Sequence, residues 1–277
     1  MLFRSAAARH SSTPLPELDP ATPALLVRVG RYPVNHGAVN AARTLGRAGV
    51  PVAAVVEDGW TPLALSRYTA RAFVSPSNGD EPADELVARL QAIAAQIGRP
   101  TVAVATDDEA AVLLAEHADV LRPALLLPRI EAGLTRRLAS KRGLYELCVE
   151  HGVPTPTTAF PQDRDDVERF AASATFPVVV KNVEPFTRLS HSAVGGTTVV
   201  HCAEDLLALA STWETPRHAM LQEFIPHEDA QDWSYQTYCN DDATPVVSFT
   251  CVKLRSWPPH AGVTALARAL PNPELER

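Results

Sequence analysis

One lysine of this sequence follows a short apolar run that is typical of a buried strand. Residues 176–180 are apolar and mostly β-branched, and Lys181 comes directly after them. A polar loop follows and closes on Gly195, Gly196 and Thr197. A buried ammonium group is costly unless it meets an anion, and glycines let the backbone approach a phosphate closely. The pattern therefore favours a phosphate site, with an ion pair between Lys181 and Glu223 as the alternative.

Two further cations alternate with apolar residues near the C-terminal end. Lys253 and Arg255 are separated by Leu254, and alternate residues of a strand face the same side. Two like charges on one face are favoured beside a polyanion; a solvated sheet face is the alternative. Asp232 comes after two other acidic residues and is a candidate for binding sugar hydroxyls, or belongs to a solvated acidic loop.

These residues are part of a series of short motifs in a definite order. The series consists of Ser140-Lys141, the segment 151–156, Lys181, Gly195-Gly196, Gln222-Glu223-Phe224-Ile225, Asp232-Trp233 and the segment 252–262. In this order the motifs resemble the nucleotide site of the ATP-grasp superfamily, in its carboxylate–amine ligase branch. The resemblance extends from about Leu25 to the C-terminus.

The resemblance implies a fold in two parts. The first is an α/β, Rossmann-like pre-ATP-grasp domain, and the second is an α+β ATP-grasp domain. Lys141 and Lys181 would bind the phosphates of ATP, and residues 195–197 would form a flap over them.

The remaining motif residues would bind the rest of the nucleotide and act in the reaction. The segment Gln222, Glu223, Phe224 and Ile225 would hold adenine, since a purine needs one backbone acceptor and one backbone N–H. Asp232 would bind ribose, and the resemblance assigns Lys253 and Arg255 to catalysis.

The implied reaction uses ATP to convert a small-molecule carboxylate into an acyl phosphate, which a small-molecule amine then attacks. A homodimer is compatible with this interpretation. The family holds Mg²⁺ with a glutamate and a later Glu-x-Asn, yet after Lys253 the only acids are Glu274 and Glu276. We therefore expect an ATP-grasp domain that is incomplete at the C-terminus. Mg²⁺ would be carried by the nucleotide, no residue is assigned as its ligand, and the chain is expected to be inactive as a ligase.

The pattern of apolar residues predicts the elements that position these motifs. Strands and helices alternate over the first half, and near-continuous apolar strands predict a parallel sheet covered on both faces. The predicted strands are 24–29, 50–56, 72–75, 101–105, 124–127, 176–181, 220–225, 233–239 and 246–254. The predicted helices are 38–47, 63–67, 84–97, 106–117, 135–151 as two helices meeting near Ser140, a helix that ends at 170–172, and 204–213.

The same pattern of residues predicts the domains of the chain. Residues 1–21 are expected to form a disordered leader, residues 22–128 the first domain and residues 129–277 the second.

Composition narrows the classes of partner. The chain of 277 residues carries a net charge of −7, which argues against a general nucleic-acid or anionic-membrane surface. Four cysteines without a C-x-x-C pair indicate free thiols in a reducing cytoplasm. Two rivals to a ligase remain: a nucleotide-binding protein without catalysis, and a Rossmann-type oxidoreductase suggested by the βαβ unit 24–56.

Overall fold

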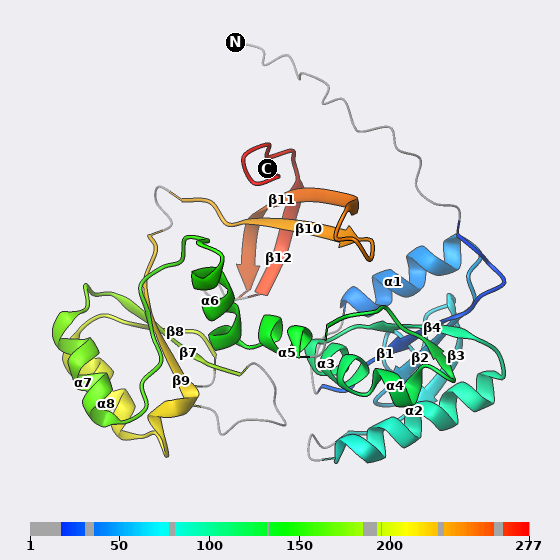
Figure 1. The fold of residues 1–277 in the computed structure, drawn as a ribbon, viewed down its shortest axis with the longest axis horizontal. Helices are drawn as coiled ribbons and strands as arrows, with labels where there is room; N and C mark the ends of the chain where they lie inside the picture. Colours follow the sequence, from blue (N-terminus) through cyan, green and yellow to red (C-terminus); the bar gives the residue numbers. More distant parts are fainter. Residues whose placement is uncertain are drawn as a thin grey trace, which may run out of the picture.

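The computed structural model describes residues 18–30, 36–77, 81–131, 133–184, 193–194, 196–226, 230–257 and 263–276. Gly195 and residues 258–262, which belong to the predicted motifs, lie outside these ranges. Three separate sheets organise the described part of the chain, and Figure 1 shows them with their helices.

The first sheet contains five parallel strands. They are β1 (Ala24–Val27), β2 (Val52–Val56), β3 (Thr69–Val74), β4 (Thr101–Ala105) and β5 (Leu125–Leu126), in the order β3-β2-β1-β4-β5. Every residue of β1 and β2 is buried, as expected for central parallel strands with both faces covered. The predicted parallel sheet is present in the described structure.

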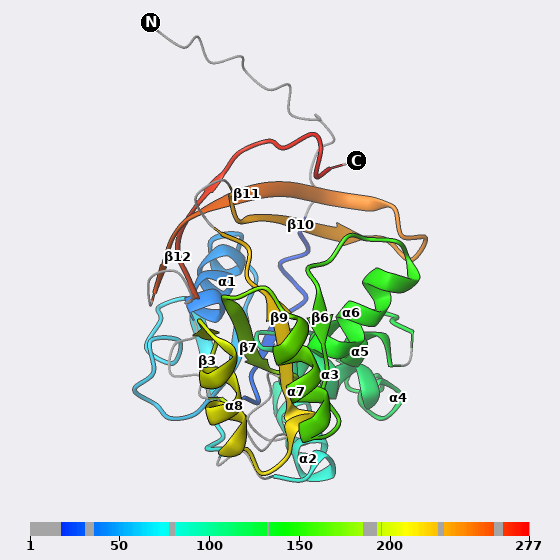
Figure 2. The same ribbon diagram turned by 90° about the vertical axis from the view of Figure 1, so that its left-hand side faces the viewer.

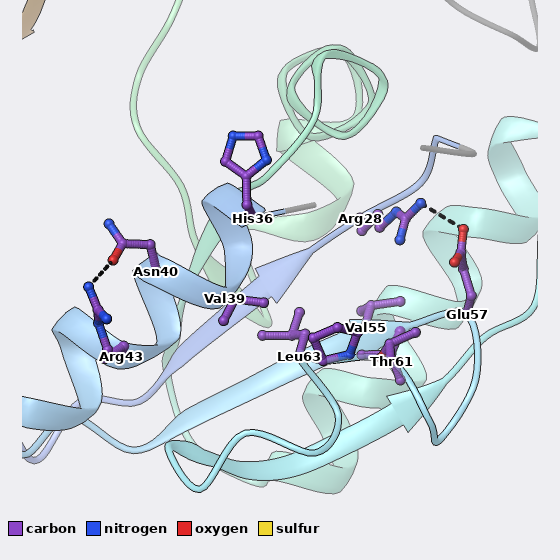
Figure 3. A pocket seen from close by; sticks show the side chains of 11 residues that line it. Arg28, His36, Val39, Asn40, Arg43, Val55, Glu57, Thr61 and Leu63 are labelled. Carbon is purple, nitrogen blue, oxygen red and sulfur yellow. Dashed lines mark hydrogen bonds and ion pairs between the residues drawn. The ribbon is translucent and has the colours of Figure 1, made fainter. Parts of the chain in front are cut away.

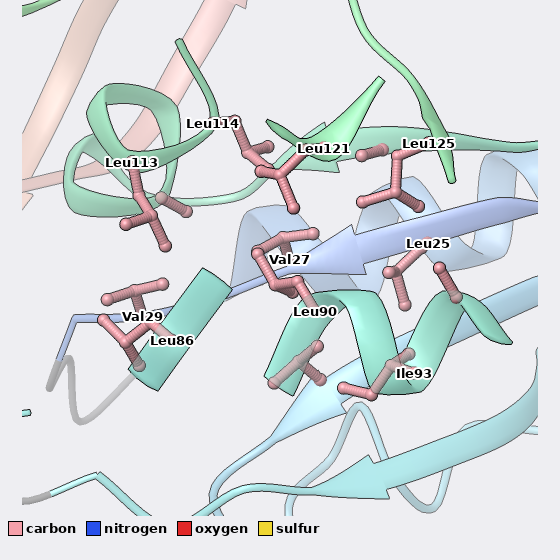
Figure 4. Close-up of a cluster of buried hydrophobic side chains, with 14 of the residues drawn as sticks. Leu25, Val27, Val29, Leu86, Leu90, Ile93, Leu113, Leu114, Leu121 and Leu125 are labelled. Carbon is pink, nitrogen blue, oxygen red and sulfur yellow. The ribbon is translucent and has the colours of Figure 1, made fainter. Parts of the chain in front are cut away.

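Helices cover both faces of this sheet. One face carries α1 (His36–Arg47), and the other carries α2 (Ala83–Ile97), α3 (Asp108–Glu116) and α4 (Ala118–Leu121). Alternate residues of β1 divide between the two cores: Leu26 packs with α1, whereas Leu25 and Val27 pack with α2, α3 and α4. Figure 4 shows the larger core, in which leucines of α2, α3, α4 and β5 surround the β1 side chains.

The second sheet is antiparallel and has helices on one face only. Its order is β6 (Thr158–Ala159), β9 (Ala219–Glu223), β7 (Val178–Asn182) and β8 (Thr198–Val200). Helices α7 (Arg164–Ser173) and α8 (Ala203–Ser211) pack on this face, against alternate side chains of β7 and β9. A short 3-10 helix, η1 (Pro216–His218), leads into β9.

Two short helices join the first two sheets. Helix α5 (Leu134–Ala139) is followed at once by α6 (Lys141–Glu150), and Ser140 caps α6 by accepting the N–H of Gly143. A Cβ added to Gly143 would lie 2.5 Å from the carbonyl oxygen of Arg137. The close approach of the two helices therefore requires glycine at this position.

The third sheet is an antiparallel meander of β10 (Trp233–Cys239), β11 (Pro245–Trp257) and β12 (Val263–Ala269). In Figures 1 and 2 it lies above both other sheets. The Thr250 hydroxyl donates to the carbonyl of Leu270 at 2.6 Å, so the segment after β12 folds back on β11. The register shifts between Lys253 and Arg255, where β11 bulges against β12.

Several predicted elements differ from the observed ones. Residues 63–67 form turns rather than a helix, and the Thr69 hydroxyl closes them by bonding the carbonyl of Leu63. The sequence interpretation also missed α4, β6 and β12. Among the described residues, no helix has the length and apolar character needed to cross a membrane.

The α5–α6 junction gives a stability prediction. Replacing Gly143 with alanine should lower the free energy of unfolding by about 1–3 kcal/mol, because overpacking against the Arg137 backbone outweighs the helix propensity gained. Urea denaturation provides the measurement. Gly59→Ala is the matched control, since nothing lies within 4 Å of an added Cβ there. Equal stability of the Gly143→Ala and wild-type proteins would contradict the tight junction.

Candidate functional site

The fold brings Lys141 and Lys181 together. Lys181 lies in β7, and Lys141 is the first residue of α6. The backbone N–H of Lys141 donates to the carbonyl of Val183 at 3.1 Å, which fixes the start of α6 beside the end of β7. Two lysines that are 40 positions apart in the sequence therefore lie in one neighbourhood.

The electrostatics of this pair indicate an anion site. Burial lowers the pKa of the Lys181 ammonium. Burial also lowers the pKa of Lys141, and the positive charge of Lys181 lowers it further, while Glu184 and Asp108 oppose the shift. Two half-buried ammonium groups that repel each other are stabilised when an anion with several charged oxygens binds both.

Lys181 points from the face of the second sheet that carries no helix. It pairs with Met220 across β7 and β9, and Gln222 pairs with Val179, so these four side chains share a face. The opposite face, with Val178, Val180 and Leu221, forms the core with α7 and α8.

Val179 and Met220 are buried on the lysine side and supply an apolar wall next to the ammonium group. The sequence interpretation did not single them out. Alternation within the apolar runs is the signal that could have identified them.

A chain of hydrogen bonds fixes Lys181 in place. Its ammonium donates to Gln222 Oε1 at 3.2 Å, and Gln222 Nε2 donates to the Thr158 hydroxyl at 3.0 Å. That hydroxyl in turn donates to the carbonyl of Pro156 at 2.8 Å. Gln222 therefore acts on the lysine through its side chain, which the sequence interpretation did not foresee.

The Glu223 carboxylate binds the main chain of Thr157 rather than Lys181, its expected partner if the lysine does not bind phosphate. Its backbone N–H donates to the carbonyl of Thr157 at 2.8 Å, and its carboxylate accepts the N–H of Thr157 at 3.1 Å. An ion pair between Lys181 and Glu223 is thus absent from the described structure. Strand β9 ends at Glu223, and Phe224 and Ile225 leave the sheet. Their main-chain contacts to adenine stay a prediction.

The end of the polar loop is held by an asparagine. Asn182 accepts the N–H groups of Ala193 and Val194 at 2.8 and 3.0 Å and donates to the carbonyl of Val194 at 2.7 Å. Gly196 and Thr197 follow and are exposed. Residues 196 and 197 therefore start close to Lys181, while Gly195 lies outside the described residues.

A carboxylate also borders the lysine pair. Ser140 Oγ, which caps α6, donates a hydrogen bond to Glu184 Oε1 at 2.8 Å. This bond connects the start of α6 to the segment that follows β7. Within the described part of the chain, Glu184 Oε2 is buried without a hydrogen-bond partner. Glu184 is a site residue that the sequence interpretation missed, since no local pattern marks it.

The third sheet pairs two of the predicted site residues with each other. Lys253 Nζ lies 3.2 Å from Asp232 Oδ2, and the Lys253 backbone N–H donates to the Asp232 carbonyl at 2.8 Å. Arg255 is exposed beyond the bulge. A bulge interrupts the simple alternation that placed Lys253 and Arg255 on one face, so their shared orientation stays a prediction.

The residues present do not form a recognisable metal centre. Among the described residues, no group of three or more His, Cys, Asp or Glu side chains is placed to hold a metal ion. We therefore assign no protein ligand to Mg²⁺ and derive no step through it. All four cysteines are free, in agreement with the sequence interpretation.

The Asp107 carboxylate joins the end of β1 to the start of α3. The Asp107 carboxylate accepts the N–H groups of Val29 and Gly30 at 3.0 and 3.2 Å and also caps α3 through Ala110. Burial raises the pKa of Asp107, and these donors oppose the rise.

Comparison with known proteins identifies the fold. No protein-family profile and no curated protein sequence matches the chain. Among solved structures, an ADP complex of N5-carboxyaminoimidazole ribonucleotide synthetase is similar over 86% of this chain and 55% of its own, at 14% identity and a TM-score of 0.62. An L-amino acid ligase from Bacillus licheniformis is similar over 92% of this chain and 57% of its own, at 14% identity and a TM-score of 0.61.

A biotin carboxylase domain of the Hydrogenobacter thermophilus 2-oxoglutarate carboxylase, in complex with MgADP, ADP and bicarbonate, gives a TM-score of 0.56. The two sequences are 14% identical, and the similarity extends over 85% of this chain and 51% of that structure's chain. These proteins are ATP-grasp enzymes. The chain has the ATP-grasp fold. It spans about half the length of these structures, and the resemblance seen in the sequence is confirmed at the level of the fold.

The lysine pair gives a prediction about pKa values. Replacing Lys181 with methionine should raise the pKa of Lys141, because the substitution removes the positive charge that lowers it. The chain has only three lysines, so NMR of the protein with ¹³C-methylated lysines resolves each one, with Lys→Arg variants for assignment.

The pH dependence of the unfolding free energy tests the same pair of lysines. With its pKa lowered on folding, Lys141 binds fewer protons in the folded state, so its contribution to stability rises with pH as pH passes the lowered value. The difference in unfolding free energy between wild type and Lys141→Met should therefore change in favour of wild type as pH rises. A pKa of Lys141 that is unaffected by Lys181→Met would show that the two ammonium groups do not interact.

Proposed function

We propose that this chain forms the nucleotide-binding part of an ATP-dependent carboxylate–amine ligase. One observation carries the proposal: Lys181 of β7 and Lys141, which begins α6 beside the end of β7, are both half-buried, and their positive charges repel each other. A triphosphate is the common cellular anion that matches two such ammonium groups. The ATP-grasp fold of the chain supports this interpretation.

In the proposed binding mode, ATP lies on the face of the second sheet opposite α7 and α8. Its phosphates meet Lys141 and Lys181, and its base packs against Val179 and Met220. The main chain at the end of β9 provides the hydrogen bonds to adenine, from the Glu223 carbonyl and the Ile225 N–H. Gln222 orients Lys181, since its amide oxygen accepts a hydrogen bond from the ammonium group.

The third sheet supplies the remaining groups of the proposal. Asp232 binds the ribose hydroxyls, and Lys253, which Asp232 now holds, moves to the phosphates when the nucleotide enters. Arg255 meets the carboxylate substrate. The substrate oxygen attacks the γ-phosphorus as ADP leaves, and the amine nitrogen then displaces phosphate from the acyl carbon. The contribution of these residues is to position the reactants and to neutralise charge.

Calorimetry with nucleotides tests the class of ligand. The chain should bind ATP and ADP and should not bind NADH, because the lysine pair matches a terminal polyphosphate. Saturable NADH binding that ATP fails to displace would overturn the proposal. Amine- and carboxylate-dependent release of ADP by this chain would show ligase turnover, contrary to the inactivity expected from its sequence.

A substitution at Lys181 tests the site directly. Lys181→Met should weaken ATP binding by about 1–3 kcal/mol, because it removes a charge-assisted contact to phosphate. Arg122→Met is the matched control, since it removes an exposed charge from the parallel-sheet domain.

The same variant distinguishes a binding role from a structural one. If Lys181 only supports the hydrogen-bond chain through Gln222, both Lys181→Met and Gln222→Leu should lower the melting temperature and leave ATP affinity unchanged. Unchanged affinity in a folded Lys181→Met protein is the result that would refute a phosphate contact.

A further inference from the structure

A carboxylate beside the lysine pair has one oxygen that makes no hydrogen bond. Glu184 follows the end of β7 by two residues, and its Oε1 accepts the Ser140 hydroxyl at 2.8 Å. Its Oε2 is buried and has no hydrogen-bond partner within the described part of the chain. A buried carboxylate oxygen without a donor is costly, so its neighbours have to compensate for it. The binding mode proposed above does not use this carboxylate.

Two hydrogen bonds place Glu184 next to Lys141. The Lys141 N–H donates to the carbonyl of Val183, the residue before Glu184, and Ser140, the residue before Lys141, binds the Glu184 carboxylate. The carboxylate is therefore held beside the first turn of α6. Burial and the charge of Lys181 lower the pKa of Lys141, and the negative charge of Glu184 opposes this shift. Glu184 thus acts as a counter-ion of Lys141 in the ligand-free protein.

Two other glutamates next to arginines take a guanidinium as a direct partner. Glu57 lies 2.6 Å from Arg28, as Figure 3 shows, and Glu116 accepts Arg136 through both oxygens at 2.5 and 2.9 Å. Glu116 occupies Arg136, and the effect of Glu184 on the same guanidinium is electrostatic. Glu184 therefore lies near two cations without a direct ion pair to either, and its charge remains available to act on whatever enters the lysine pair.

A negative charge at this position opposes every anion that the two lysines attract. An anion that binds Lys141 competes with Glu184 for the ammonium group and is repelled by the carboxylate. A simple phosphate anion has only the charges of the lysines to bind it. A nucleotide adds the contacts of its base with Val179 and Met220. A repulsive group that weakens both ligands therefore leaves measurable binding only for the one with further contacts.

We propose that Glu184 is a specificity-determining residue that keeps simple phosphate anions out of the nucleotide site. The inference rests on the nucleotide site proposed above. While that site is empty, the Glu184 carboxylate is the counter-ion of Lys141. Inorganic phosphates fail to displace it, whereas the phosphates of ATP do so because the base and sugar supply further binding energy.

Calorimetry with inorganic tripolyphosphate as the probe, without divalent cations, tests the proposal. Glutamine in place of Glu184 keeps an acceptor for the Ser140 hydroxyl and removes the charge. The Glu184→Gln protein should bind tripolyphosphate at least about fivefold more tightly than wild type, and ATP should gain by a similar factor. Both gains should shrink at high salt. Unchanged or weaker tripolyphosphate binding, or equal affinity of wild type for tripolyphosphate and ATP, would overturn the proposal.

A second glutamate supplies the matched control. Glu131 is exposed and lines the same cavity of about 490 Å³ as Glu184. Glu131→Gln should leave tripolyphosphate binding and the pKa of Lys141 unchanged, whereas Glu184→Gln should lower that pKa, as measured by NMR of the methylated lysines. A Glu184→Gln protein with a lower melting temperature, weaker binding of both ligands and an unchanged Lys141 pKa would show that Glu184 has only a structural role.

The two proposals fail on different measurements. If wild type does not bind ATP, the nucleotide proposal is wrong, yet tighter tripolyphosphate binding by Glu184→Gln still supports anion exclusion at the lysine pair. If wild type binds ATP and the variant binds tripolyphosphate no better, only the role of Glu184 is refuted.

Discussion

The structure around the candidate site depends on keeping two ammonium groups close together and partly out of water. Burial disfavours both charges, and the charge of Lys181 adds to the penalty on Lys141. Such an arrangement persists only where the backbone leaves the side chains no better position. Here the core beneath α7 and α8 fixes β7, and the bond from the Lys141 N–H to the Val183 carbonyl fixes α6. The cost in the ligand-free state is recovered when an anion binds.

The choice of lysine is informative in this chain. Only three of its 25 basic residues other than histidine are lysines, and all three, Lys141, Lys181 and Lys253, are among the predicted site residues. Arginine supplies the positive charge almost everywhere else, including the ion pairs Arg28–Glu57 and Arg136–Glu116. A compact ammonium on a flexible stem suits phosphate oxygens, while a guanidinium fork suits a carboxylate. The distribution of the two residue types therefore agrees with phosphate on the second sheet.

Much of this site could be predicted from residue pattern because local rules govern it. The apolar run before Lys181 defined a buried strand, and Ser140 marked a helix start, which its bond with the Gly143 N–H confirms. The bond from Lys181 to Gln222 could not be predicted, since it depends on the register between β7 and β9. The hydrogen bonds between Asn182 and residues 193 and 194 could not be predicted either.

Other predictions reached a limit set by tertiary structure. Leucine-rich residues 63–67 have helix formers, yet turns closed by Thr69 prevail there. Strand β6 has two residues and exists only through pairing with β9, so no periodicity announces it. The domain boundary near residue 128 and the role of Gly195 stay predictions.

The first turn of helix α3 connects the end of β1 to the candidate site. The Asp107 carboxylate caps α3 and also holds the N–H of Gly30, whose carbonyl accepts a hydrogen bond from Arg28. The next residue, Asp108, acts electrostatically on Lys141 at the candidate site. A shift of this turn would therefore alter both the placement of Arg28 and the field at Lys141. Because each contact involves a buried or half-buried group, such a shift is costly, and the turn fixes Arg28 and Lys141 in one arrangement.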